Sequence, residues 1–339
     1  MTGKETNIVT IEGLSAESWE QAKKYAAVIG NVSSLFSSCI RFLMKDYASG
    51  QKTLSTASKY SLGRLLSSPS FKAPIYFAAK AFKGEELEAK GKITPEELAA
   101  LFTPDELAHL VGMLYVYRRL QRLAPEDEWK EISKLTHTHA QLGGLVGQAL
   151  PRIGLSWGLL LGTVRHLSWG LFVVADKKVF TNYRRQTKIK KLSFDIPEET
   201  RLWGCNHLQV GSLVIQQLGL GTAIPQSINL GLLNHDTPDD RVSDEGYRAR
   251  ILWIWIEALK ATGCQPDITH KGAYYPVKAA AEKLETLAAP IISDGVPIEF
   301  YRVNKDDLTP QSAPHLFAAG EAAGEPVDAE VQAEIQSLE

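Results

Sequence analysis

The sequence contains few cysteines and has almost no net charge, and each of these features excludes some classes of protein. Its three cysteines, Cys39, Cys205 and Cys264, lie far apart in 339 residues, and their spacing matches no zinc-binding motif. This sparse, odd-numbered set predicts a reducing compartment, so we expect a cytoplasmic protein. A formal net charge of −2 provides no general attraction to nucleic acid or to a membrane surface.

Long uninterrupted hydrophobic runs are also missing. The opening residues Met1 to Asn7 are polar and lack the apolar core of a secretory signal. The most apolar stretch, residues 153–175, carries Arg165 and His166 near its centre. A charge at that depth is costly in lipid, so we interpret the stretch as two buried helices on either side of Arg165 and expect no membrane partner.

Strand patterns are scarce, since only Ile8–Ile11 and Val296–Val303 resemble strands. Apolar residues at helical spacing dominate instead and predict an all-α fold. The main predicted helices follow Ser15 or cover residues 35–47, 104–120, 129–150, 198–218 and 247–261. Thr94-Pro95-Glu96-Glu97 and Thr103-Pro104-Asp105-Glu106 have the composition of capping boxes at two helix starts.

A set of histidines and turn residues marks the middle of the chain. His137 lies on one predicted helix and His166 on the next, and Trp203-Gly204 precedes His207-x-x-Val210-Gly211. Further turn signals lie on both sides of this region: Ser68-Pro69-Ser70-Phe71, Phe82-Lys83-Gly84, Leu218-Gly219-Leu220 and Pro225.

In their order and spacing, these features of residues 54–238 resemble the HDOD family, the HD-related output domain of bacterial signalling proteins. The sequence departs from the family pattern at Ala79-Lys80, where Asn-Ser is usual, and at Phe102-Thr103, where Leu-Gly is usual. The resemblance implies an HD-superfamily-like helical bundle. On this interpretation the chain comprises an N-terminal helical pair (1–53), the HDOD-like domain (54–238), a C-terminal helical extension (239–318) and an acidic tail (319–339).

The resemblance also implies an ancestral metal site that this chain has lost. A working HD phosphohydrolase needs a His-Asp pair, but the matching position here is His166-Leu167, and leucine cannot bind a metal. His137, His166, Leu167 and His207 are then remnants of the site. We therefore expect a non-catalytic bacterial regulatory protein with no cofactor and with a signalling protein partner; homo-oligomer formation stays open.

Two other functions compete with this interpretation. The dipeptide His235-Asp236 could form a separate metal site with His207, which would make the chain a metal-dependent HD phosphohydrolase. Its neighbours Asn234 and Pro238 are typical of a loop, however, and a metal-binding pair should lie on a packed helix.

The second alternative rests on a basic run that could contact an anion, a ligand or a nucleic acid: Arg184, Arg185, Lys188, Lys190 and Lys191. No aromatic interleaving supports single-strand binding, so we interpret the run as a solvated connection and do not expect nucleic acid. The residues from Gly320 to Glu339 contain six acidic and no basic side chains, and we expect this tail to be mobile and able to fold over the basic run.

Two helices have unusual composition. Gly143, Gly144 and Gly147 have no preceding strand, so they predict close helix packing rather than a phosphate loop. Trp253 and Trp255 lie on different sides of an apolar helix, which suggests that one is buried in the domain and the other against a partner.

Overall fold

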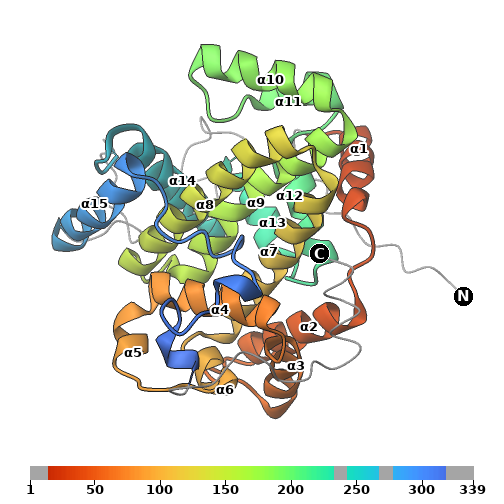
Figure 1. Ribbon diagram of the computed structural model, residues 1–339. Coiled ribbons are helices and arrows are strands. Elements are labelled where there is room, and N and C mark those ends of the chain that lie inside the picture. Colours follow the sequence, from red (N-terminus) through yellow and green to blue (C-terminus); the bar gives the residue numbers. More distant parts are fainter. Residues whose placement is uncertain (1–13, 233–242, 267–277, 318–339) are drawn as a thin grey trace, which may run out of the picture.

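The fold is all-α, as the apolar spacing predicts. A computed structural model of the chain describes residues 14–232, 243–266 and 278–317 (Figure 1). Within these ranges it contains fifteen α-helices and short 3-10 turns, and no strand. The predicted strand at Ile8–Ile11, the dipeptide His235-Asp236 and the tail 319–339 lie outside the described residues.

The helices follow one another with short connections. The first six are α1 (Ala16–Ala26), α2 (Ser34–Ala48), α3 (Thr56–Leu66), α4 (Pro69–Phe82), α5 (Gly84–Glu88) and α6 (Pro95–Ala99). The middle five are α7 (Pro104–Leu123), α8 (Glu126–Ala149), α9 (Gly154–Ala175), α10 (Lys177–Lys190) and α11 (Ile196–Trp203). The last four are α12 (His207–Gln217), α13 (Ala223–Leu232), α14 (Asp244–Thr262) and α15 (Lys278–Ser293). The 3-10 turns are η1 (Ala27–Ile29), η3 (Lys305–Asp307) and η4 (Pro314–Leu316).

Local signals set several helix ends where the sequence predicts them. The Ser15 side chain caps α1, and Gly263 ends α14 in the left-handed conformation. Both predicted capping boxes are present, at Thr94 with Glu97 and at Thr103 with Glu106. These ends were predictable because each depends on side chains within three residues of the cap.

Helices α8 and α9 form the centre of the molecule and pack against each other more extensively than any other described pair. Glycine makes this close approach possible. A Cβ at Gly143 or Gly158 would overlap the other residue's carbonyl group, and one at Gly147 would overlap the backbone of Gly154. The prediction that these small residues serve helix packing is therefore confirmed.

The other helices surround this pair (Figure 1). Helices α7 and α12 pack on α9, while α14 and α15 pack on α8. Helices α2 to α6 lie together at one end of the molecule, and α10 and α11 lie at the other. One continuous cluster of buried apolar side chains extends from Ala22 to Ala313, so helices from the N-terminal pair and the C-terminal extension share a core with the middle of the chain.

Helix α9 is a single helix, so the prediction of two helices separated near Arg165 is wrong. Arg165 and His166 lie within it, 3% and 1% exposed; Arg165 donates a hydrogen bond to His207, and the His166 ring packs against that of His139. By length and composition α9 could cross a membrane, but 89% of its apolar window is buried in the protein. Among the other described helices, only α1–η1 and α2 pass this test, as a pair bent by 116°.

Two further helix predictions need correction. The polar connection that follows α9 is itself a helix, α10, whose Asp176 cap accepts a hydrogen bond from the Val179 amide. The single helix predicted for residues 198–218 is two helices, because Gly204 adopts a left-handed conformation and Asn206 caps a new helix. This break decides the geometry of the site described below.

The C-terminal extension differs from prediction in two places. Residues 296–303 are irregular, with a turn at 300–302, and do not form a strand. The adjacent side chains Phe300 and Tyr301 are both buried, which a strand with one solvent face would not allow. Trp253 and Trp255 are both buried within the chain, 5% and 0% exposed, so neither is available to a partner.

Candidate functional site

A buried polar network lies where α9, α10, α11 and α12 meet. Its centre is Glu199, which is fully buried and accepts four hydrogen bonds. One carboxylate oxygen accepts from the Tyr183 hydroxyl at 2.5 Å and the Trp169 indole N–H at 3.1 Å. The other accepts from the backbone N–H and Nδ1 of His207, at 2.9 and 2.6 Å. The break between α11 and α12 places His207 beside Glu199.

The network keeps Glu199 ionised and His207 neutral. Burial opposes ionisation of Glu199, but the hydrogen bonds from His207 and Tyr183 outweigh it, so the pKa of Glu199 is below its ordinary value. Burial is the main cause that lowers the pKa of His207; Glu199 opposes this effect and Arg165 adds to it. Because Arg165 Nε can only donate, His207 Nε2 accepts, and His207 Nδ1 carries the proton that it donates to Glu199.

Arg165 supplies the hydrogen bond to His207. Its Nε donates to His207 Nε2 at 2.9 Å, so both ring nitrogens of His207 are engaged within the chain. The Arg165 guanidinium carbon lies 3.7 Å from the ring centroid of Trp253 and 4.1 Å from that of Phe194. Burial lowers the pKa of Arg165 to about 9, which leaves a cation inside the bundle at neutral pH.

A second part of the network joins α8, α9 and α14. The imidazole rings of His139 and His166 lie 4.1 Å apart, and His139 Nε2 lies 3.5 Å from a carboxylate oxygen of Glu257. Although burial opposes ionisation, the closeness of His139, the charge of Lys260 and a hydrogen bond from Ser193 lower the pKa of Glu257 to about 2. Burial lowers the pKa of His139 and of His166.

The pairing of helices selects His139 rather than His137 as the neighbour of His166. His137 lies on the other face of α8, donates from Nδ1 to the Ser133 carbonyl at 2.9 Å, and packs against Tyr117, Phe300 and Tyr301. The predicted set His137, His166 and His207 is thus split between two places. Side chains two residues apart on a helix point to nearly opposite sides, so only one of His137 and His139 can join the network.

Leu167 lies in the apolar core, 1% exposed. Among the residues that the structure describes, no group of three or more histidine, cysteine, aspartate or glutamate side chains is arranged to hold a metal ion. The three cysteines are free, Cys39 and Cys205 being buried and Cys264 exposed.

The basic run lies on α10, and most of its charges contact acidic side chains. Arg184 and Lys188 both pair with Glu131, at 2.6 and 3.0 Å, and Lys190 pairs with Asp195 at 2.7 Å. The Arg184 guanidinium also lies over the Trp169 ring, 4.4 Å from its centroid. Arg184 therefore contacts both Glu131 near the surface and Trp169, a member of the buried network.

The other two members of the run lie at the surface of α10. Arg185 donates to Asn182 on its own helix at 3.2 Å, and Lys191 ends the helix with a positive φ of 55°. The side chains of Ile189 and Leu192, close to Lys191 in the sequence, are 68% and 44% exposed.

Several members of the network were not singled out as site residues from sequence. Arg165 was recognised only as a charge in an apolar stretch, and Glu257 was not recognised at all. Their common signal is a charged residue inside an otherwise apolar helix, which requires a buried partner. No family model, curated protein or solved structure matches this chain.

Proposed function

We propose that this protein is a non-catalytic regulatory protein that acts by binding a signalling partner or a small ligand. The observation that carries the proposal is the saturated imidazole of His207. Its two nitrogens are occupied by Glu199 and by Arg165, at 2.6 and 2.9 Å. A histidine bound in this way stabilises the bundle and has no lone pair to offer to a substrate or an ion.

The described residues at the HD-like positions do not fit a metal ion. Metal binding at His207 would displace the hydrogen bond from Arg165 and bring a second cation close to a buried guanidinium. Leu167 stands where the family resemblance requires an aspartate, and His137 faces the opposite side of α8. Each of these two differences removes one metal ligand. The buried guanidinium of Arg165 already supplies a positive charge near Glu199 and Glu257, where a metal ion would otherwise do so.

Metal analysis of the purified full-length protein tests the proposal. Protein produced with iron, manganese and zinc in the medium should retain none of them in stoichiometric amount. It should also release no product from phosphomonoesters, nucleotides or cyclic dinucleotides. A stoichiometric metal that is lost in the His166→Ala variant, or hydrolysis that depends on His166, would contradict the proposal.

The alternative HD phosphohydrolase would use His207 with His235 and Asp236. His207 is engaged as described above, and His235 and Asp236 lie outside the described residues. The same metal analysis on His235→Ala separates the two functions, because loss of a stoichiometric metal in that variant favours the phosphohydrolase. For the regulatory function, affinity purification from the native host should recover a signalling protein.

Nucleic-acid binding through the basic run 184–191 is the weaker alternative, since three of the five basic side chains of that run already pair with acidic groups of the chain. A mobility shift with generic DNA or RNA that decreases as salt rises would support it. Absence of a shift at low salt would leave the regulatory proposal in place.

A further inference from the structure

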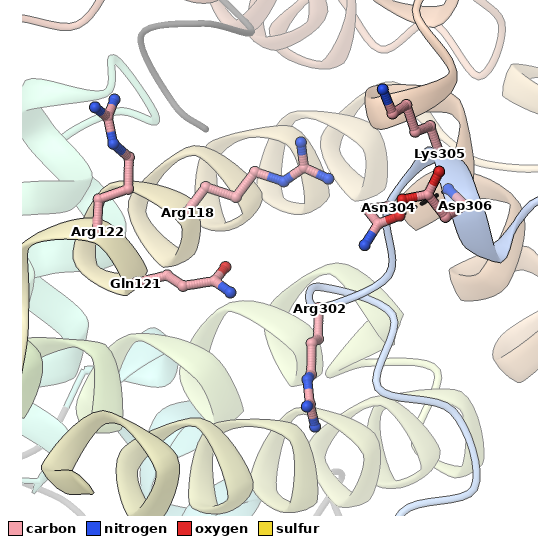
Figure 2. A pocket seen from close by; sticks show the side chains of 7 residues that line it. All are labelled: Arg118, Gln121, Arg122, Arg302, Asn304, Lys305 and Asp306. Carbon is pink, nitrogen blue, oxygen red and sulfur yellow. Dashed lines mark hydrogen bonds between the residues drawn. The ribbon is translucent and has the colours of Figure 1, made fainter. Parts of the chain in front are cut away.

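A polar cavity of about 550 Å³ lies between the end of α7 and the segment that follows Tyr301 (Figure 2). Helix α7 contributes Arg118, Gln121 and Arg122 to its wall, and residues 302–306 contribute most of the rest. Figure 2 shows Arg118 and Gln121 extending from α7 toward the segment that carries Arg302 and Asn304. The cavity is separate from the buried network around Glu199 and shares none of its residues.

Arg118 gives this cavity a fixed cationic wall. Its side chain is 7% exposed, and its Nη2 donates to the backbone carbonyls of Ser70 and Val303, at 2.6 and 3.1 Å. The guanidinium carbon also lies 5.3 Å from the centroid of the Phe71 ring. These contacts hold one arginine in a single position, so a ligand that meets it does not have to order a flexible side chain.

The opposite wall is fixed by two buried aromatic residues. Phe300 packs edge-on against Phe82, and Tyr301 stacks on Tyr117 with ring centroids 5.8 Å apart. Immediately after them, the Asn304 side chain accepts from the Asp306 amide at 2.7 Å and caps η3. The segment that carries Arg302 and Lys305 is therefore tied to the core at one end and to a capped turn at the other.

The charges on the cavity wall favour an anion. The described lining residues contain four cationic side chains and one acidic side chain, and Glu299 pairs with Arg302 at 2.9 Å from outside the lining. The carbonyl end of α7 carries partial negative charge, which Arg122 in its last turn offsets. Among the described residues, the four cationic side chains of the lining outnumber the three acidic groups near them, which are Asp306, Glu299 and the Asp307 carboxylate that acts on Arg302.

We propose that this cavity binds a small molecule that carries two or more phosphate groups. The seven described residues of the lining all carry charged or amide side chains, so the part of the cavity that they form offers mainly hydrogen bonds and charge. Guanidinium groups suit phosphate oxygens because they donate two parallel hydrogen bonds. The volume is within the usual range for small-molecule sites.

This inference deepens the proposed regulatory function by naming a ligand class, and it can fail independently of that proposal. Calorimetric titration of the full-length protein with pyrophosphate, ATP and inorganic phosphate at low salt tests it. We expect pyrophosphate and ATP to bind with similar affinity, inorganic phosphate to bind more weakly, and binding to weaken as salt rises.

Two matched double variants locate the site. Arg302→Gln with Lys305→Gln should weaken pyrophosphate binding by about tenfold or more, because two charge-assisted contacts are removed. Arg201→Gln with Lys178→Gln removes the same charge from exposed positions on α11 and α10 and should leave binding unchanged. Thermal melting of both variants checks that the fold is intact.

Absence of binding by pyrophosphate and ATP at millimolar concentration would overturn the inference. An equal loss of affinity in both double variants would also overturn it, because it would show a general response to net charge. If the Arg302 and Lys305 variant melts early, the single variant Lys305→Glu supplies the same test, since Lys305 is exposed and a glutamate there should repel the ligand. A metal found in the protein would contradict the proposed function and leave this result standing.

Discussion

Identical substitutions at two adjacent glutamates of α11 test the buried network most directly. Glu199 is fully buried, whereas Glu198 pairs with Arg201 at the surface. In Glu199→Gln, one carboxylate oxygen becomes an NH₂ group of similar size. If the NH₂ group replaces the oxygen that faces Tyr183 and Trp169, the donors of these two residues lose their acceptor. If it replaces the other oxygen, the two N–H groups of His207 lose theirs.

The expected cost follows from the burial of these groups. A buried donor left without an acceptor costs about 1–3 kcal/mol, and loss of one partner from a buried charge pair costs about 3–5 kcal/mol. The Gln variant keeps two of the four hydrogen bonds but loses the negative charge near Arg165, so we expect a loss of about 3–5 kcal/mol in the free energy of unfolding. In a chain of this size, this corresponds to a decrease of roughly 4–7 °C in Tm.

Urea denaturation followed by circular dichroism measures the change, with thermal melting as a second measurement. Glu198→Gln is the matched control and should melt with the wild type, because exposed ion pairs contribute little to stability. The reasoning is refuted if Glu199→Gln unfolds at the same urea concentration as Glu198→Gln. Such a result would mean that the four hydrogen bonds to Glu199 do not hold the bundle together.

Three further predictions concern pH, the central cation and the α8–α9 contact. Burial lowers the pKa of His109 and of His137 to about 4, so the unfolded chain takes up protons first as pH falls below about 6.5; urea denaturation at pH 7 and pH 5 should show a loss of about 2 kcal/mol for each histidine. Arg165→Met leaves His207 Nε2 without its donor and should cost about 3–5 kcal/mol in the same assay, whereas an unchanged midpoint would show that the buried cation is dispensable. Gly158→Ala forces a methyl group against the Gly143 carbonyl and should lower Tm, with a cost of about 1–3 kcal/mol, whereas Gly84→Ala, which has open space around it, should not.

The sequence predicted much of the secondary structure because the relevant signals are local. The capping boxes at Thr94 and Thr103, the Ser15 cap and the stop at Gly263 each depend on side chains within one helical turn. The helix covering residues 177–190 was missed because its apolar positions, such as Phe180 and Tyr183, are few among many charged ones. The break at Gly204 was missed because apolar spacing continues across it.

The candidate site was less predictable, because its members come from six helices. Sequence reasoning singled out His166 and His207 but paired them with His137, whereas packing of α8 on α9 turns His139 toward His166. Glu257 and Trp253 reach the same place from α14, far along the chain. No spacing within one helix carries this information, since it depends on which faces of separate helices meet.

The sequence by itself determined an all-α protein with defined helix starts, a glycine-lined helix contact and a leucine after His166 that cannot bind a metal. These properties depend on single residues and on short spacings, because helix caps and helical faces are set by side chains within a few residues of one another. Only the tertiary structure decided which histidines meet, that Arg165 saturates His207, and that Arg118 and Arg302 line one cavity. Such contacts join residues far apart in the chain, and they arise when burial of apolar faces fixes how the helices pack.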